Sequence, residues 1–367
     1  MEVKVDSTTK IIDSDAHPWI NGDVKGLMPY LSTAWQRRFE GSKSTLPDHP
    51  LRPPLAGGTS IRRDTRPPGG GAGGSDPEFM REDHLDRHDI EYAVLSSIQA
   101  GKIATLPNAD EAVTLARAFN DYFTNEWLTV DSRYRLAMCV AAHDPLAAAD
   151  EIRRIGGDEG VVAVFIPLLN ILMGNRHYYP IYEAAEEHGL PVLIHPTGTE
   201  GGFQTSVAFA GGNPSTYIER HTIFPEVAMA SITSLVFEGV FVRFPGLKVL
   251  AAEFGYSWVP HLLWRMDQNW REFRREVPWI EREPSTYFLD HVRFTSQPAE
   301  EPEKREYLMQ ILEMVHADRT LLFSTDYPHW DTDYPKTTFR RIPDDLRRRI
   351  FHDNAAELFG LGTHARV

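Results

Sequence analysis

Eight short apolar segments alternate with amphipathic helical segments along most of this 367-residue chain. Because a helix that follows a strand carries the chain back beside it in parallel, this alternation predicts a parallel sheet with helical crossovers. Eight such units favour a closed barrel over an open, doubly wound sheet. The expected strands are Lys10–Asp13, Tyr92–Ser97, Arg135–Val140, Val161–Ile166, Pro191–Ile194, Leu247–Ala252, His291–Ser296 and Arg319–Ser324.

Helical periodicity marks the segments between these strands, and two of the expected helices have recognisable ends. Asn108, a residue type that caps helix N-termini, precedes the helix Ala109–Thr129. Gly189, a residue type that ends helices, follows the helix Tyr178–His188. The other expected helices are Phe79–Asp89, Pro145–Ile155, Pro225–Phe237, Ser257–Val277, Glu303–Val315, Pro343–Phe351 and Asn354–Phe359.

We therefore expect one barrel domain over residues 1–367, interrupted after its first strand. From Pro18 to Glu78 the sequence predicts irregular structure, with Pro and Gly recurring through its second half. Such composition does not easily bury a core. We expect residues 40–78 to form an insertion that caps the barrel or reaches a neighbouring subunit, since long loops in compact domains are usually functional or disordered.

Composition excludes several classes of partner. The formal charge of −14 argues against nucleic acid, because phosphate binding needs concentrated Lys and Arg. Residues 1–10 lack the apolar core of a signal peptide, and no stretch reaches the roughly eighteen apolar residues of a membrane span.

Cys139 is the only cysteine, which excludes an intrachain disulfide, and its apolar surroundings predict a buried side chain. We expect a soluble, cytoplasmic protein that acts on a small molecule.

Ligand-type side chains follow the ends of four expected strands. They are Asp15 and His17 after the first strand, His195 after the fifth, Glu253 after the sixth and Asp326 after the eighth. In a barrel these ends meet on one face, where active sites lie. Each residue alone has a plain structural explanation, such as a helix cap or a core histidine, but the set predicts a divalent metal bound by Asp15, His17, His195 and Asp326.

These residues lie in segments that resemble the amidohydrolase superfamily, and in particular its branch with the aminocarboxymuconate-semialdehyde and resorcylate decarboxylases. The resemblance runs from Ile11 to about Leu361. It implies a distorted (β/α)8 barrel with a mononuclear or binuclear metal centre. The matching segments are Ile11–His17, Leu190–Pro196, Gly239–Glu253, Ser257–Pro260, Phe323–Trp330 and Asn354–Ala356.

The resemblance also assigns individual positions. It places His17, His195 and Asp326 at ligand positions, and Asp15 where many members carry the first His of a His-x-His motif. Some decarboxylases carry Glu there, so a carboxylate is tolerated. Glu253 lies where several relatives carry a catalytic His or a Glu, which implies an acid/base or ligand role.

Two metal-dependent reactions on a small carboxylate-bearing substrate remain open, hydrolysis and non-oxidative decarboxylation. The resemblance implies that binuclear hydrolases carry a bridging Lys or Glu at the end of the fourth strand. Val161–Ile166 contains neither, which disfavours a hydrolase-type binuclear centre. Zinc is the first expectation for the metal, with iron or manganese as the alternatives.

The expected catalytic residues are Asp326, Glu253, His329 and His221. Asp326 would accept the proton in hydrolysis, and Asp326 or Glu253 would protonate the carbon that loses CO2 in decarboxylation. His329 would contact substrate or hold Asp326 in place, and His221 would line the pocket or provide an additional ligand. Two further residues, Arg220 and Arg293, are candidates for neutralising a substrate carboxylate.

A different class is oxidation. A few members of the superfamily resemble non-haem oxygenases such as 2-aminoisobutyrate hydroxylase, which is built from two related barrel subunits. Carboxylate-rich ligation suits iron or manganese. The alternative is therefore an iron or manganese oxygenase of the amino acid hydroxylase type, or the partner subunit of one. We expect a homo-oligomer, or a hetero-oligomer with a related barrel subunit.

Overall fold

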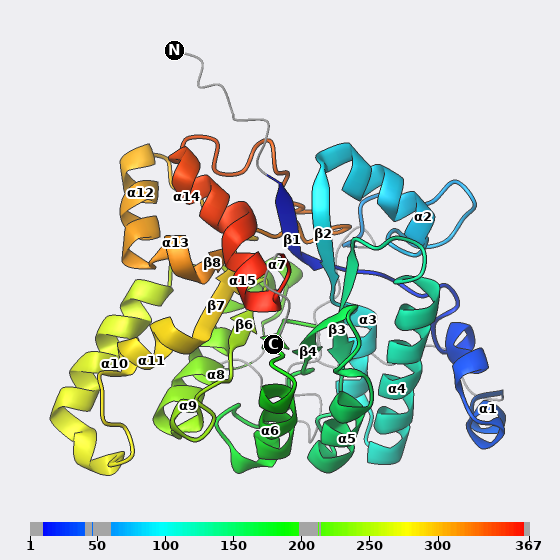
Figure 1. Cartoon of the computed structure of the whole chain (residues 1–367), viewed down its shortest axis with the longest axis horizontal. Helices are drawn as coiled ribbons and strands as arrows, with labels where there is room; N and C mark the ends of the chain where they lie inside the picture. Colours follow the sequence, from blue (N-terminus) through cyan, green and yellow to red (C-terminus); the bar gives the residue numbers. More distant parts are fainter. Residues whose placement is uncertain (1–9, 41–45, 47–59, 198–211, 213, 363–367) are drawn as a thin grey trace.

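A computed structural model describes residues 10–40, 46, 60–197, 212 and 214–362. Within them, eight parallel strands pair in chain order along one sheet, so the predicted (β/α)8 architecture is confirmed (Figure 1). The strands are β1 Ile11–Ala16, β2 Ile90–Leu95, β3 Tyr134–Cys139, β4 Val161–Phe165, β5 Val192–Ile194, β6 Val249–Ala251, β7 Val292–Thr295 and β8 Leu321–Leu322.

The sheet closes into a barrel where β1 meets the residues after β8. His17 N donates to Tyr327 O at 2.7 Å, and Asp326 N donates to Asp15 O at 3.1 Å. A parallel bridge also pairs Ala16 with Tyr327. The closing hydrogen bonds therefore join the two segments that carry three of the four expected ligands.

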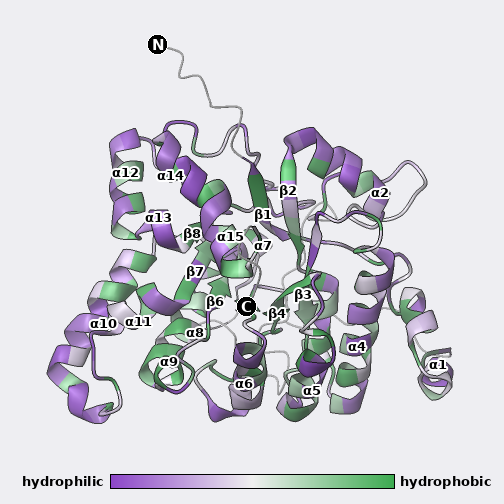
Figure 2. Cartoon of the chain, in the orientation of Figure 1, coloured by the Kyte–Doolittle hydropathy of each residue, from purple (hydrophilic) through white to green (hydrophobic). Residues whose placement is uncertain are grey.

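Helices surround the strands, and their outward faces are hydrophilic while the strands are mostly hydrophobic (Figures 1 and 2). Asn108 caps α4 as predicted, with its side chain accepting from Glu111 N at 3.1 Å. The helices are α1 Thr33–Glu40, α2 Pro77–Met80, α3 Ile98–Gly101, α4 Ala109–Glu126, α5 Pro145–Ile155, α6 Tyr179–Glu187, α7 Tyr217–Thr222, α8 Pro225–Phe237, α9 Val240–Arg243, α10 Val259–Phe273, α11 Pro284–His291, α12 Arg305–Met314, α13 Ala317–Thr320, α14 Asp344–Arg348 and α15 Asn354–Phe359.

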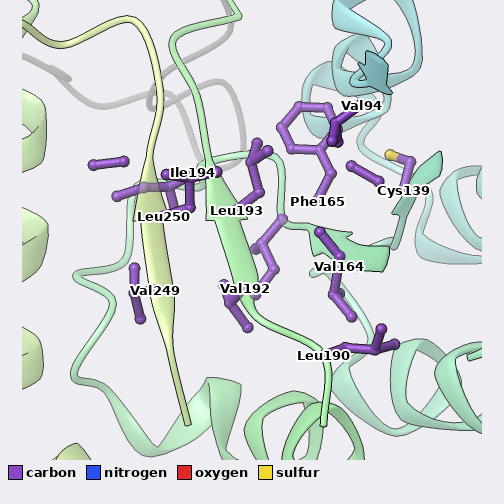
Figure 3. Close-up of a cluster of buried hydrophobic side chains, with 14 of the residues drawn as sticks. Val94, Cys139, Val164, Phe165, Leu190, Val192, Leu193, Ile194, Val249 and Leu250 are labelled. Carbon is purple, nitrogen blue, oxygen red and sulfur yellow. The ribbon is translucent and has the colours of Figure 1, made fainter. Parts of the chain in front are cut away.

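The core is formed by side chains of neighbouring strands. Val164 of β4, Val192 and Leu193 of β5 and Val249 of β6 are all fully buried (Figure 3). Helices cover the outer face of the barrel and side chains fill its interior, so both faces of β4, β5 and β6 are buried and these strands are continuous apolar runs in the sequence. Cys139 lies in this core, as predicted.

The structure corrects three of the expected elements. The segment after β1 is not irregular throughout, because a 3-10 helix spans Asp23–Tyr30 and α1 follows it. The 3-10 helix packs beside α4 and carries the buried residues Val24 and Leu27. The helix expected over 79–89 is α2 followed by a π-helical segment at 81–86. β1 continues to residue 16, so Asp15 lies within the strand rather than after it.

Most of the expected insertion lies outside the described residues, but its second part is described. Residues 60–76 form turns that lie against the loop after β8. Trp330 N donates to Ser60 O at 2.8 Å, and an antiparallel bridge pairs Ile61 with His329. Gly74 also approaches β1, where a Cβ would lie 2.7 Å from the carbonyl oxygen of His17. This segment therefore contacts the residues that follow β1 and those that follow β8.

None of the helices within the described residues combines the length and apolar character that crossing a bilayer requires.

Candidate metal centre

The four expected ligands lie together at the carboxyl end of the barrel, and all four are buried. Asp15 lies in β1, His17 directly follows β1, His195 follows β5, and Asp326 follows β8. Each offers one ligand atom, and these atoms lie within 4.8 Å of one another. Asp15 Oδ2 lies 3.0 Å from His195 Nε2 and 3.8 Å from His17 Nε2.

Backbone carbonyls orient both imidazoles. His17 Nδ1 lies 2.7 Å from Ser96 O, and His195 Nδ1 lies 3.0 Å from Pro196 O. Because a carbonyl accepts but never donates, each Nδ1 carries the proton. Each Nε2 is therefore directed into the group, where it binds a cation through its lone pair once it is unprotonated, and this is how metal-binding histidines are usually fixed.

Asp326 is held by two imidazoles through one oxygen. Its Oδ1 lies 2.6 Å from His17 Nε2 and 2.7 Å from His329 Nδ1. Burial disfavours its ionised form, but the nearby charges of His329 and His17 hold the pKa of Asp326 below its usual range. His329 therefore contacts Asp326 directly, which is the arrangement that one of its two predicted roles requires.

Polar atoms without partners indicate that this donor set fits a cation. Within the described part of the chain, His195 Nε2 and Asp326 Oδ2 are buried and make no hydrogen bond. Buried polar atoms normally have partners, so each such exception needs an explanation. Burial opposes charging of His17, yet Asp15 and Asp326 outweigh it and raise the pKa of His17 to about 10. The potential here is therefore negative, and it favours a bound cation.

Two of the site carboxylates lie on left-handed backbone. The φ angles are 60° at Glu253 and 59° at Asp326. Non-glycine residues seldom adopt this region, and such strain persists where the surrounding structure enforces it, often at functional sites. The strained turns direct both side chains into the barrel mouth.

Glu253 and His221 join the same mouth, as predicted, together with a residue that the sequence analysis missed. Glu253 Oε2 lies 3.3 Å from His195 Nε2, and Glu253 Oε1 lies 3.5 Å from His221 Nε2. The missed residue is Asp331, whose Oδ2 lies 3.3 Å from His221 Nε2. Burial and the charge of Asp326 both raise the pKa of Glu253.

A second missed carboxylate, Asp13, holds the backbone segment that carries Asp326. It accepts from Thr325 N at 2.9 Å, from Thr325 Oγ1 at 2.5 Å and from His84 Nε2 at 2.8 Å. Thr325 precedes Asp326, so Asp13 fixes the backbone that carries this side chain. The available signal was an acidic residue two positions before Asp15 in the same segment.

The two candidate arginines lie in different places. Arg220 of α7 is buried and lines a pocket shared with Glu253 and His329. The aromatic residues Trp19, Tyr217 and Phe224 line the same pocket. Arg293 instead donates to Leu289 O and Val292 O at the start of β7, the end of the strand remote from the mouth. The alternative that placed Arg293 at the substrate is therefore wrong.

Comparison with known proteins gives one family and a consistent set of relatives. A family model described as amidohydrolase matches residues 12–361. The gamma-resorcylate decarboxylase of Rhodococcus jostii (strain RHA1) is 25% identical over 304 residues, which cover 78% of this chain and 88% of the relative.

Two solved structures share the fold. The 5-carboxyvanillate decarboxylase of Sphingomonas paucimobilis has a TM-score of 0.67 and 21% identity, over 97% of this chain and 100% of that one. The 5-carboxyvanillate decarboxylase of Novosphingobium aromaticivorans, in complex with manganese and 4-hydroxy-3-methoxy-5-nitrobenzoic acid, has a TM-score of 0.69 and 18% identity, over 96% and 97%.

Proposed function

Because the chain belongs to the amidohydrolase family, we propose that it is a metal-dependent, non-oxidative decarboxylase of a small aromatic carboxylate. One observation carries the proposal: the buried group of Asp15, His17, His195 and Asp326 lies beside a pocket that combines a buried arginine with aromatic side chains. The names of the relatives point to the same substrate class.

We assign Asp15, His17, His195 and Asp326 as the metal ligands. A divalent cation held there would supply positive charge that binds the substrate carboxylate and an adjacent hydroxyl oxygen. Manganese is supported by the metal in the Novosphingobium relative. Zinc, the first expectation from the sequence, and iron are the alternatives that metal analysis distinguishes.

The side chains around the pocket bind the substrate and deliver the proton. Arg220 neutralises a substrate carboxylate, and Trp19, Tyr217 and Phe224 surround the aromatic ring. Asp326 takes up a proton from His329, to which it is hydrogen-bonded, and delivers it to the ring carbon that carries the carboxylate. A π electron pair of the ring forms the new carbon–hydrogen bond. The carbon–carbon bond then breaks, CO2 leaves, and the electron pair of the broken bond restores the aromatic π system, while the ring carbon keeps the new hydrogen.

Product analysis in labelled solvent tests the proposal. The protein is incubated in D2O with gamma-resorcylate and with 5-carboxyvanillate, and products are followed by NMR and CO2 release. We expect one deuterium at the carbon that lost CO2. Hydrolysis would instead place solvent oxygen in the product, and oxygenation would consume O2. Either result without release of CO2 would refute decarboxylation.

A further inference from the structure

A second group of ligand-type side chains adjoins the first four. It consists of His221 on α7, Glu253 after β6 and Asp331 in the loop after β8, and one ligand atom from each lies within 4.8 Å of the others. The three come from different elements and meet only in the folded barrel. They face the same mouth as His195, whose Nε2 lies 3.3 Å from Glu253 Oε2.

The spacing in this group is longer than that of direct ion-pair hydrogen bonds. His221 Nε2 lies 3.5 Å from Glu253 Oε1 and 3.3 Å from Asp331 Oδ2, whereas such bonds measure about 2.7–2.9 Å. His221 Nε2 is buried and makes no hydrogen bond within the described residues. Two ligand atoms, each about 2.1 Å from one cation, lie roughly 3.0–3.5 Å apart. The observed spacing matches a shared cation.

Surrounding contacts hold the three side chains in place. The His221 ring centroid lies 4.9 Å from that of Phe224 and 5.7 Å from that of Trp330. Gln297 Nε2 donates to Asp331 Oδ2 at 3.0 Å. Glu253 N donates to Thr295 Oγ1 at 3.0 Å, and the Glu253 side chain is only 6% exposed. Preorganisation of this kind is what a metal site requires.

We propose that His221, Glu253 and Asp331 bind a second divalent cation beside the first. Glu253 bridges the two, because its oxygens face the first group through His195 and the second through His221. The bridge comes from β6, so the lack of a Lys or Glu in β4 does not prevent a two-metal centre. Mixed nitrogen and oxygen ligation suits manganese, iron or zinc.

Metal titration tests this directly. Protein stripped of metal is titrated with Mn²⁺, and bound metal is measured by elemental analysis and electron paramagnetic resonance. We expect wild type to bind two equivalents, with the six-line signal of isolated Mn²⁺ lost through coupling between neighbouring ions. Asp331→Asn and His221→Ala should each bind one equivalent and regain the six-line signal.

A control variant outside both groups tests whether the loss of metal is specific to the second group. His88→Gln, outside both groups, should still bind two equivalents, and thermal unfolding checks that each variant is folded. Saturation of wild type at one equivalent would overturn the proposal, since His221 would then be an imidazolium between two carboxylates. Two equivalents in both Asp331→Asn and His221→Ala would also overturn it. Decarboxylation with one metal would leave the proposed function standing.

Discussion

Replacing Asp13 with Asn should destabilise the protein without removing a metal ligand. In Asp13→Asn an amide NH2 group replaces one carboxylate oxygen. This group donates hydrogen bonds and does not accept them, so hydrogen-bond donors of Thr325 or His84 then face another donor. A buried donor left without a partner costs about 1–3 kcal/mol. Two such donors give a loss of about 4 kcal/mol in the free energy of unfolding, similar to the cost of breaking a buried pair.

This loss of stability lowers the melting temperature by a measurable amount. With an unfolding entropy of about 2.1 cal/mol/K per residue, 4 kcal/mol lowers Tm by about 5 °C for a chain of 367 residues. Circular dichroism melts at one scan rate, with EDTA present, report this shift in the metal-free protein.

Asp15→Asn is the matched control, two residues along the same strand. Its amide keeps an acceptor for Ser96 Oγ and places a donor near His195 Nε2. We expect its metal-free Tm to fall less than that of Asp13→Asn, because the amide keeps an acceptor for Ser96 Oγ and His17 keeps Asp326 as a counter-charge after losing that of Asp15. It should, however, lose the stabilisation that added Mn²⁺ gives wild type. The reasoning is refuted if Asp13→Asn melts like wild type in EDTA, or if both variants lose the same amount.

Three further predictions concern activity and pH. His195→Ala should lose bound metal and decarboxylase activity while its circular dichroism stays native; full activity would contradict the ligand assignment. Arg220→Met should raise KM for the carboxylate substrate by about 10-fold or more, the value of a charged hydrogen bond, whereas Arg293→Met should leave KM unchanged; equal effects in steady-state kinetics would count against the pocket. Burial, with the charges of His84 and Arg87, lowers the pKa of His88 from 6.5 to about 4. The unfolded chain therefore binds a proton that the folded protein excludes, and stability falls as pH drops from 6.5 towards 4; Tm measured at pH 7.5 and pH 5 should fall less in His88→Gln than in wild type.

The barrel and the principal site residues could be predicted from the sequence because both follow from local pattern. Apolar runs separated by helical segments specify the strand order, and residues at strand ends converge in any parallel barrel. Asp15, His17, His195 and Asp326 were found on that basis, and their convergence is confirmed by the structure. The family resemblance, carried by five segments around these residues and a closing one, is confirmed as well.

What could not be predicted depends on long-range contacts. Asp331 lies in a loop with no regular period, so only the fold brings it to His221. Asp13 looked like part of a strand, and its partner Thr325 lies 312 residues further along the chain. Arg220 and Arg293 were equivalent as sequence candidates, because a charge alone does not tell which end of a strand its side chain reaches.

The pairing of residues 60–62 with the loop after β8 links the insertion to the catalytic rim. Ile61 forms an isolated antiparallel bridge with His329, and Arg62 N donates to Pro328 O at 3.0 Å. Relatives could thus diverge in substrate preference by exchanging this insertion while every ligand stays the same. A chimera carrying the insertion of another family member would move the wall of the pocket at Ser60 and leave the chemistry of the mouth intact.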